Sequence, residues 1–274
     1  MNIGFIGAGR VGCSLGKYFS LHGFFVSGYY SRSRESSETA SKLTGSKVFD
    51  NPKDLIQESD MILLTVPDGM IESVAEEIMS FELTGKILCH CSGAMSSEVF
   101  SCMDEYGGRC SVHPLMAVSS KEHDVSNAFF TIEGNEKAIT EVKKILDKCG
   151  NTYQEIDKEH KNKYHAAAAV ASNLAVGILD MAIEMLMECG FDKDKAMEAL
   201  TPLAIGNVNA VMEKGPKDAL TGPVSRGDEI TVSKHLQVLS DDEKEIYRLL
   251  SLRLLRLAGL PEIDNDRMKG ILEK

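Results

Sequence analysis

The sequence lacks an excess of positive charge. It holds 30 lysines and arginines against 41 aspartates and glutamates, which gives a formal net charge of −11. A phosphate backbone therefore finds no attractive long-range field on this chain. We expect an acidic surface that favours solubility, and no nucleic-acid partner.

The sequence also lacks paired cysteines. Its seven cysteines are an odd number and include no C-x-x-C pair, a pattern that fits neither a disulfide framework nor a zinc site. We therefore expect reduced thiols and no metal. No basic segment precedes an apolar stretch at the N-terminus, and no uncharged run reaches membrane-spanning length. These absences predict a cytoplasmic protein without a membrane partner.

The first part of the chain alternates short apolar runs with helix-like segments, which is typical of a largely parallel sheet with crossover helices. A chain of 274 residues with 43% apolar residues exceeds what one core usually organises, so we expect two domains. The predicted strands are 3–6, 24–29, 61–66, 86–91, 110–112 and 129–132.

After Gly150 the pattern becomes helical and rich in alanine, leucine and methionine. We place the domain boundary between Gly150 and Lys158. The fold class is then an α/β Rossmann domain with a mostly parallel sheet over residues 1–152, followed by an all-α domain over residues 153–274. The predicted helices are 159–189, 193–213 and 230–260, the last broken near 240, with a loop over 214–229 and a peripheral tail after 261.

A glycine-rich turn, Gly7-Ala8-Gly9-Arg10-Val11-Gly12, follows the first predicted strand and opens a helix. In G-x-G-x-x-G the first glycine permits a tight turn, the second lets the backbone approach a pyrophosphate, and the third allows close helix packing. The motif in this context predicts a dinucleotide site. The alternative is that the glycines only make a turn.

The end of the second strand selects between cofactors, because an acidic side chain there usually binds the ribose of NAD. This chain has Tyr30-Ser31-Arg32-Ser33-Arg34 instead, whose hydroxyl and guanidinium groups suit the 2′-phosphate of NADP(H). Ser33 alternatively caps the next helix. Val66-Pro67 leaves the sheet at the same edge, either beside the cofactor or as a plain turn. The predicted cofactor-binding residues are Gly7, Ala8, Gly9, Arg10, Val11, Gly12, Ser31, Arg32, Ser33, Val66, Pro67 and Ser92.

Polar residues at later strand ends and on the first long helix are the candidate substrate site. Ser92 can hydrogen-bond a carbonyl or carboxylate, and His113 can orient it or donate a proton, unless it is a turn histidine; His90 we regard as structural. Asn173 either contacts substrate or ties helices together. The predicted catalytic residues are Lys163, His165 and Asn173, and the predicted substrate-binding residues are Ser92, His113, Ser172, Thr221, Arg226 and Asp228.

Arg226 is the candidate clamp for a substrate carboxylate, since a guanidinium can bind it through two parallel hydrogen bonds. The alternative is that Arg226 pairs with Asp228 while Asp228 caps the following helix.

Five motifs carry a resemblance to a known family: 4–12, 90–94, 113–115, 164–168 together with 171–173, and 220–228. Together the chain resembles a bacterial family of Rossmann-like NADP oxidoreductases whose helical domain was long labelled as of unknown function. The resemblance implies a helical domain related to those of 6-phosphogluconate and 3-hydroxyisobutyrate dehydrogenases. It also implies a homodimer formed through that domain and a site between the domains.

Some members of that family look like an alternative ketopantoate reductase, so the resemblance implies NADPH-dependent reduction of a small 2-oxo acid to its 2-hydroxy acid. The wider dehydrogenases place a lysine one helical turn before an asparagine, whereas Ala169 stands there before Asn173 in this chain. His165 therefore becomes an alternative to Lys163 as proton donor. Other functions compatible with the sequence are reduction of a cyclic imine or a prephenate-like acid, or a non-catalytic regulatory role.

Overall fold

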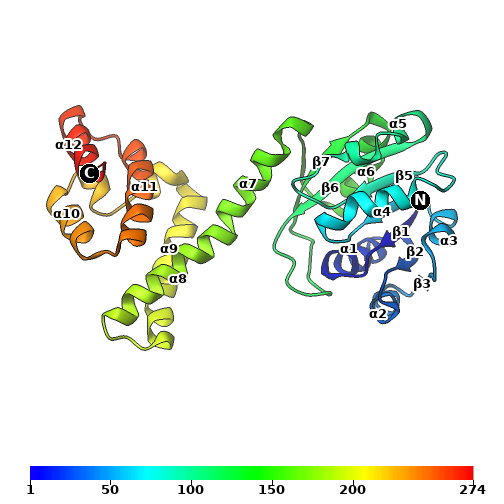
Figure 1. The fold of residues 1–274 in the computed structure, drawn as a ribbon, viewed down its shortest axis with the longest axis horizontal. Coiled ribbons are helices and arrows are strands. Elements are labelled where there is room, and N and C mark those ends of the chain that lie inside the picture. The colour runs from blue at the N-terminus through cyan, green and yellow to red at the C-terminus, as the bar shows by residue number, and fades with distance from the viewer. Residues whose placement is uncertain (274) are drawn as a thin grey trace. The chain divides into compact units, whose positions relative to one another are not determined.

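The computed structural model describes residues 1–273 (Figure 1). By contacts the chain divides into two compact units, Met1–Asn173 and the part from Leu174 onward.

The N-terminal unit is built on one eight-stranded sheet with the order β3-β2-β1-β4-β5-β6-β7-β8. All neighbouring strands are parallel except β6 and β7, so the predicted mostly parallel sheet is confirmed. The strands are β1 (Asn2–Ile6), β2 (Phe25–Tyr30), β3 (Lys47–Val48), β4 (Met61–Leu64), β5 (Ile87–His90), β6 (Gly108–Leu115), β7 (Phe129–Gly134) and β8 (Tyr153–Glu155).

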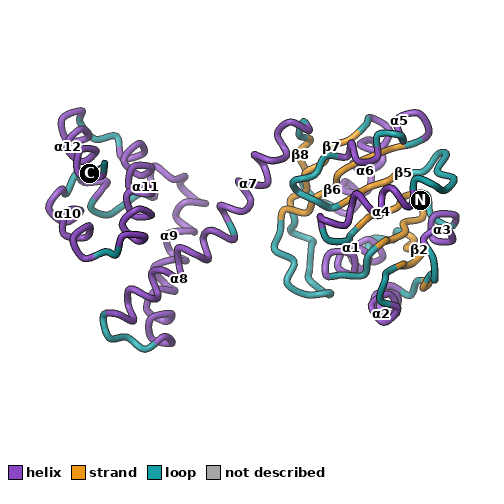
Figure 2. The backbone as a smooth tube through the Cα atoms, in the orientation of Figure 1, coloured by secondary structure: helices purple, strands orange, loops and turns teal. Residues whose placement is uncertain are grey.

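Helices cover the two faces of this sheet, as the tube in Figure 2 shows. The α-helices of the unit are α1 (Arg10–Leu21), α2 (Arg34–Thr44), α3 (Pro52–Gln57), α4 (Ile71–Ile78), α5 (Met103–Tyr106), α6 (Glu136–Cys149) and α7 (Lys161–Ala171). Short 3₁₀ turns are η1 (Asp68–Met70), η2 (Ser97–Phe100) and η3 (Lys158–His160).

The central strands are apolar on both faces because each face packs against helices. One core contains Phe5 and Tyr29, whose rings stack with centroids 5.1 Å apart. The second contains Ile62, Leu64 and Leu88 on the opposite face. This burial on both sides explains why strand segments read as continuous apolar runs in the sequence.

The strand order reverses next to β1, which has β2 on one side and β4 on the other. In open α/β sheets, ligands bind outside the carboxyl ends of the strands at such a switch point. The glycine turn after β1 and the segments after β4 and β5 meet at this edge, which therefore positions the candidate site.

The boundary between the units lies further along the chain than the sequence predicted. β8 begins at Tyr153, which pairs with Phe130 of β7, and the division by contacts falls between Asn173 and Leu174. The predicted boundary after residue 152 separates β8 from its sheet, because a three-residue strand leaves no clear periodic signal.

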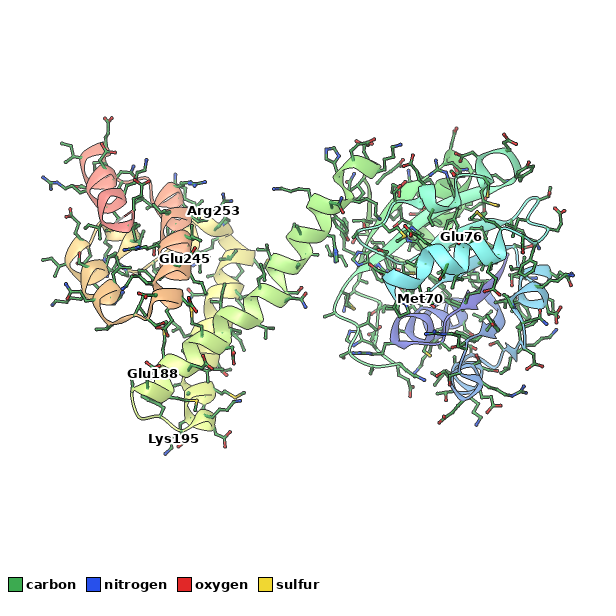
Figure 3. The ribbon with its side chains drawn as sticks, viewed as in Figure 1. Met70, Glu76, Glu188, Lys195, Glu245 and Arg253 are labelled. Carbon is green, nitrogen blue, oxygen red and sulfur yellow. The ribbon has the colours of Figure 1, made fainter. Side chains whose placement is uncertain are left out.

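The C-terminal unit is all-helical, as predicted. Its elements are α8 (Asn173–Glu188), α9 (Lys193–Ala219), η4 (Val224–Arg226), α10 (Glu229–Val238), α11 (Asp241–Ala258) and α12 (Glu262–Leu272). Two residues labelled in Figure 3 locate the turn between the first two of these helices, because Glu188 ends α8 and Lys195 lies in the first turn of α9. The predicted first helix is interrupted at Ser172, which ends α7 before α8 begins.

Two sequence-based predictions for this unit are wrong. α9 continues to Ala219 with a break at Gly215, where φ is +80°, so the predicted loop from residue 214 is partly helical. The segment after Pro261 is not peripheral, because α12 buries Met268 and Leu272 in the core of the unit with Val232 and Leu255.

The helical segment Lys158–Glu188 is long and apolar enough to cross a membrane by length and composition, and none of its most apolar stretch is buried. The sequence analysis expected no uncharged run of membrane-spanning length. This segment agrees with that expectation only because it contains the charged residue Asp180. Length and composition do not distinguish a membrane span from a helix whose apolar face packs on another protein surface.

Candidate functional site

The glycine-rich turn between β1 and α1 is fixed by close backbone approach. Gly7 has a φ of +110°, and a Cβ there would lie 2.8 Å from the Thr65 carbonyl carbon. A Cβ on Gly12 would lie 2.4 Å from the Thr65 hydroxyl, which itself donates a hydrogen bond of 2.8 Å to the Gly7 carbonyl. Packing alone therefore requires glycine at positions 7 and 12.

Gly9 is different, because packing does not require it. A Cβ there would have only the Thr65 carbonyl oxygen near it, at 4.0 Å, and its φ of −79° suits any residue. Gly9 is the N-cap of α1 and makes no side-chain cap, so the first N–H groups of the helix are free for an anion. Open space at a helix N-terminus fits a pyrophosphate that must come close to the backbone.

A cavity of about 290 Å³ begins at the end of β2 and runs along this turn. Its lining includes Ile6, Gly7, Ala8, Gly9, Tyr30, Ser31, Arg32, Pro52, Val66, Pro67 and Met70, the last of which is labelled in Figure 3. Ser31 and Arg32 after β2 and Val66-Pro67 after β4 therefore line the same cavity. The Ser33 hydroxyl instead accepts from the Ser36 N–H and caps α2, which is the alternative reading of that residue.

A second cavity of about 490 Å³ extends the groove past β4 to the end of β5. It shares Gly9, Val66 and Pro67 with the first cavity, and it reaches Asp68 and Cys91. Arg10 and Val11 also line it. The two cavities together form a groove that leads from a loop suited to a 2′-phosphate, past a helix N-terminus, to a group of polar side chains.

Ser92 supports this site rather than facing it. The residue is 2% exposed, and its hydroxyl donates to Asp68 Oδ2 at 2.7 Å while accepting from the N–H groups of Ala94 and Met95. A fully engaged, buried hydroxyl has no capacity left for a ligand. The predicted direct contacts of Ser92 with cofactor and substrate are therefore corrected: Ser92 holds the Asp68 carboxylate at the cavity.

His90 forms hydrogen bonds with the backbone of the loop that follows β5. Its Nδ1 accepts from the Ser92 N–H at 3.2 Å, and its Nε2 lies 3.2 Å from the Ser96 carbonyl, to which it donates. Burial lowers the pKa of His90 to about 4, so the imidazole is neutral at pH 7. These contacts agree with the structural role predicted for His90.

His113 is paired with Tyr164 of α7. Its Nδ1 lies 2.7 Å from the Tyr164 hydroxyl, and the two rings meet edge to face. Burial, together with the charges of Lys161 and His165, lowers the pKa of His113 to about 4. Burial raises the pKa of Tyr164. Both side chains are therefore uncharged at pH 7, and the phenol keeps its proton.

His165 lies close to this pair, and the two lysines of the same helix differ in their burial. The ring of His165 is half-buried, with its centroid 6.5 Å from that of His113. Lys163 is exposed, but Lys161 is 2% exposed. The sequence reasoning chose a helix face through Asn162 and missed Lys161 and Tyr164. The i, i+3, i+4 spacing of positions 161, 164 and 165 could have indicated their shared face.

The remaining predicted residues are two at the end of the N-terminal unit and three in the C-terminal unit. Ser172 and Asn173 are exposed, and the Ser172 hydroxyl donates to Asn173 Oδ1 at 2.9 Å. Arg226 and Thr221 are exposed in the C-terminal unit. Asp228 caps α10 by accepting from the N–H and hydroxyl of Thr231, as its alternative reading stated. Substrate roles for these residues stay predictions.

The fold and groove define the chain as a dinucleotide-binding α/β protein with a helical C-terminal unit. Residues 1–114 match the Rossmann-like domain family, and residues 128–254 match a domain of unknown function, DUF2520. The chain therefore matches both of these domain families, which supports the family resemblance found in the sequence. The comparison with curated proteins finds no match.

Solved structures show the same fold over nearly the whole chain. A protein from Thermotoga maritima is 27% identical, with a TM-score of 0.73, over 93% of this chain and 98% of that chain. A protein from Bacteroides fragilis named as an NADP oxidoreductase is 23% identical, with a TM-score of 0.71, over 92% and 97%. An NADP-bound pyrroline carboxylate reductase from Plasmodium falciparum is 17% identical, with a TM-score of 0.63, over 99% and 98%.

Proposed function

We propose that this protein is an NADPH-dependent reductase of a small 2-oxo acid, with ketopantoate as the first candidate substrate and pantoate as its product. The observation that carries the proposal is the groove that runs from Arg32 past Gly9 to Asp68, near which the neutral Tyr164–His113 pair lies. Structural neighbours named as NADP-dependent enzymes support a reductase.

NADPH, when bound along the groove, supplies the hydride for such a reduction. The chain must then deliver a proton to the oxygen of the former ketone. Tyr164 can move its phenolic proton to that oxygen, and a neutral His113 that carries its proton on Nδ1 can donate to the phenolate left behind. His165 is the second candidate donor. We assign Asn173 to orienting the carbonyl and Arg226 to the carboxylate, as the sequence analysis predicted.

Reduction of an imine is the second candidate function, and one observation favours it. The carboxylate of Asp68 lines the cavity with only one oxygen engaged by Ser92. A negative charge beside the hydride acceptor stabilises a protonated imine and disfavours a second carboxylate. Imine reductases are among the structural neighbours, for example one from Myxococcus stipitatus at 20% identity and a TM-score of 0.62.

The test is loss of NADPH absorbance when the purified protein is mixed with ketopantoate, with other 2-oxo acids, a cyclic imine and prephenate run in parallel. Rapid oxidation with ketopantoate supports the first candidate, and oxidation only with the imine supports the second. If NADPH binds but no compound is reduced, both are wrong, and a protein that co-purifies would indicate a regulatory role.

Arg32 should decide the preference for NADPH over NADH. A charge-assisted contact with a phosphate is worth about 1.5–3 kcal/mol, so Arg32→Ala should weaken NADPH binding by about 10- to 100-fold and leave NADH binding unchanged. The matched control is Arg34→Ala, because Arg34 is paired with Glu38 and Asp50. Fluorescence titration with both cofactors measures the effect; an equal loss for NADPH and NADH would contradict the assignment.

We further propose a cytoplasmic homodimer formed through the C-terminal helices. Val176 of α8 and Leu203 and Met212 of α9 are 67%, 62% and 80% exposed, and apolar exposure on this scale usually marks an interface. Light scattering should give twice the mass of one chain, and Val176→Asp should shift the protein toward the monomer. A wild-type protein that is monomeric at micromolar concentration would contradict this proposal.

A further inference from the structure

Lys161 is a charged residue enclosed by the N-terminal unit. It is the first residue of α7, and only 2% of it is exposed. Burying an ammonium group is costly unless hydrogen bonds and opposite charges compensate for the lost water. A buried lysine at the start of a helix that carries the candidate proton donor therefore requires a physical explanation.

The ammonium group of Lys161 joins α7 to the ends of two strands. Its Nζ donates to the Ser111 hydroxyl at 2.5 Å and to the Ser92 carbonyl at 3.2 Å. The Ser111 hydroxyl in turn donates to the same Ser92 carbonyl at 3.0 Å. Ser92 is in the loop after β5, and Ser111 lies in β6 two residues before His113. The three groups thus form a closed hydrogen-bonded triangle beneath the site.

This triangle fixes where α7 meets the sheet. Tyr164 follows Lys161 by three positions and lies on the same helix face. Its hydroxyl contacts His113, whose ring also packs on Gly93: a Cβ added to Gly93 would lie 3.1 Å from the imidazole. Lys161 is therefore attached to the loop and the strand that carry the contacts of Tyr164.

The charged and titratable groups around Lys161 explain how its ammonium group can stay buried. Burial lowers its pKa, while Glu133 of β7 and Asp68 of η1 act in the opposite direction, as do the thiols of Cys91 and Cys110.

The titratable groups that face His113 come from three elements. Besides Tyr164, they are Lys161 and His165 of α7, whose charges lower its pKa, and Asp68 of η1, which raises it. His90 lies at the end of the neighbouring strand, β5, and feels both Lys161 and His113.

We propose that Lys161 is a positioning residue of the reductase: its ammonium clamps the Ser92 carbonyl and the Ser111 hydroxyl, and so sets Tyr164 against His113. Lys161 transfers no proton and contacts no substrate. Burial is the main reason why the imidazole of His113 stays neutral, and the positive charge of Lys161 acts in the same direction. This inference rests on the proposed reductase function, but its electrostatic part can be measured without turnover.

The test compares Lys161→Met, Lys161→Arg and the control Lys137→Met, a variant of an exposed lysine of α6. Lys161→Met should lower kcat by about 100-fold, the loss expected for a misplacement of roughly 1 Å, with NADPH binding unchanged. Lys161→Arg should restore part of the activity because it keeps the charge, and Lys137→Met should behave as wild type. Equal losses of kcat and NADPH affinity, or full activity of Lys161→Met, would overturn the proposal.

The second measurement is the titration of His113 followed by NMR in the wild type and in Lys161→Met. Removing the nearby positive charge should move the pKa of His113 upward from about 4, and the acid limb of the kcat/KM profile should move the same way. His165→Ala is the control for the other charge on α7. If the wild type reduces none of the compounds, the proposed function is wrong, but the NMR titration still tests whether the charge of Lys161 acts on His113. An unchanged pKa of His113 in Lys161→Met would refute this electrostatic role.

Discussion

Tyr164→Phe should reduce kcat by about 100- to 10,000-fold, the range that general acid catalysis contributes, while NADPH binding stays unchanged. The substitution removes one oxygen and keeps the ring that packs on His113. The proton that the phenol would deliver to the reduced carbonyl is then missing. Stopped-flow measurement of NADPH oxidation separates the chemical step from product release and gives the effect directly.

His165→Ala is the comparison that makes this result decisive. If Tyr164 is the donor, His165→Ala should have the smaller effect. A large loss in His165→Ala together with near-normal turnover in Tyr164→Phe would transfer the role to His165, which the sequence analysis named beside Lys163 as a candidate donor. Thermal unfolding of both variants shows whether either change acts through stability.

The second large effect concerns Gly9. Gly9→Val should weaken NADPH binding by at least about 100-fold, because its side chain would occupy the space at the helix N-terminus that a pyrophosphate needs. Folding should be retained, since a Cβ at this position meets nothing closer than 4.0 Å and the φ of −79° suits valine. Isothermal titration with NADPH, with circular dichroism to verify the fold, measures both parts.

Gly270→Ala is a matched control for Gly9→Val, since a Cβ at Gly270 also meets no atom within 4 Å and the residue lies in α12 of the other unit. It should bind NADPH as the wild type does. Normal NADPH binding by Gly9→Val would show that the cofactor does not approach the turn after β1, and the groove would need another ligand.

Much of the N-terminal unit could be predicted, because its signals are local. The apolar runs of β1 and β4, the glycine turn between β1 and α1, and the absence of an acid after β2 can each be recognised within a few residues. The three-residue β8 could not be recognised, since its place depends on pairing with β7. The burial of α12 was missed because its apolar residues are sparse, and only packing shows that Met268 is enclosed.

The sequence indicated which segments of the chain form the candidate site, but not which of their side chains meet there. The structure brings together the strand-end motif around Ser92 and the helix around His165, both of which the sequence analysis singled out. The sequence cannot give the helical phase at which α7 meets the sheet. That phase buries Lys161 and partly buries Tyr164 against the sheet, and it leaves Lys163 exposed to solvent. The sequence also could not show that the Ser92 hydroxyl already donates a hydrogen bond to Asp68.

The sequence by itself determined the Rossmann-type α/β unit, the glycine turn for a pyrophosphate and the residues suited to a 2′-phosphate, because these depend on backbone conformation and residue type over short spans. Only the tertiary structure decided which polar side chains meet at the carboxyl edge. Tyr164 and His113 are 51 residues apart in the sequence, and Lys161 and Ser111 are 50 apart. Their hydrogen bonds exist because the packing of α7 removes water from groups that must then bond to one another.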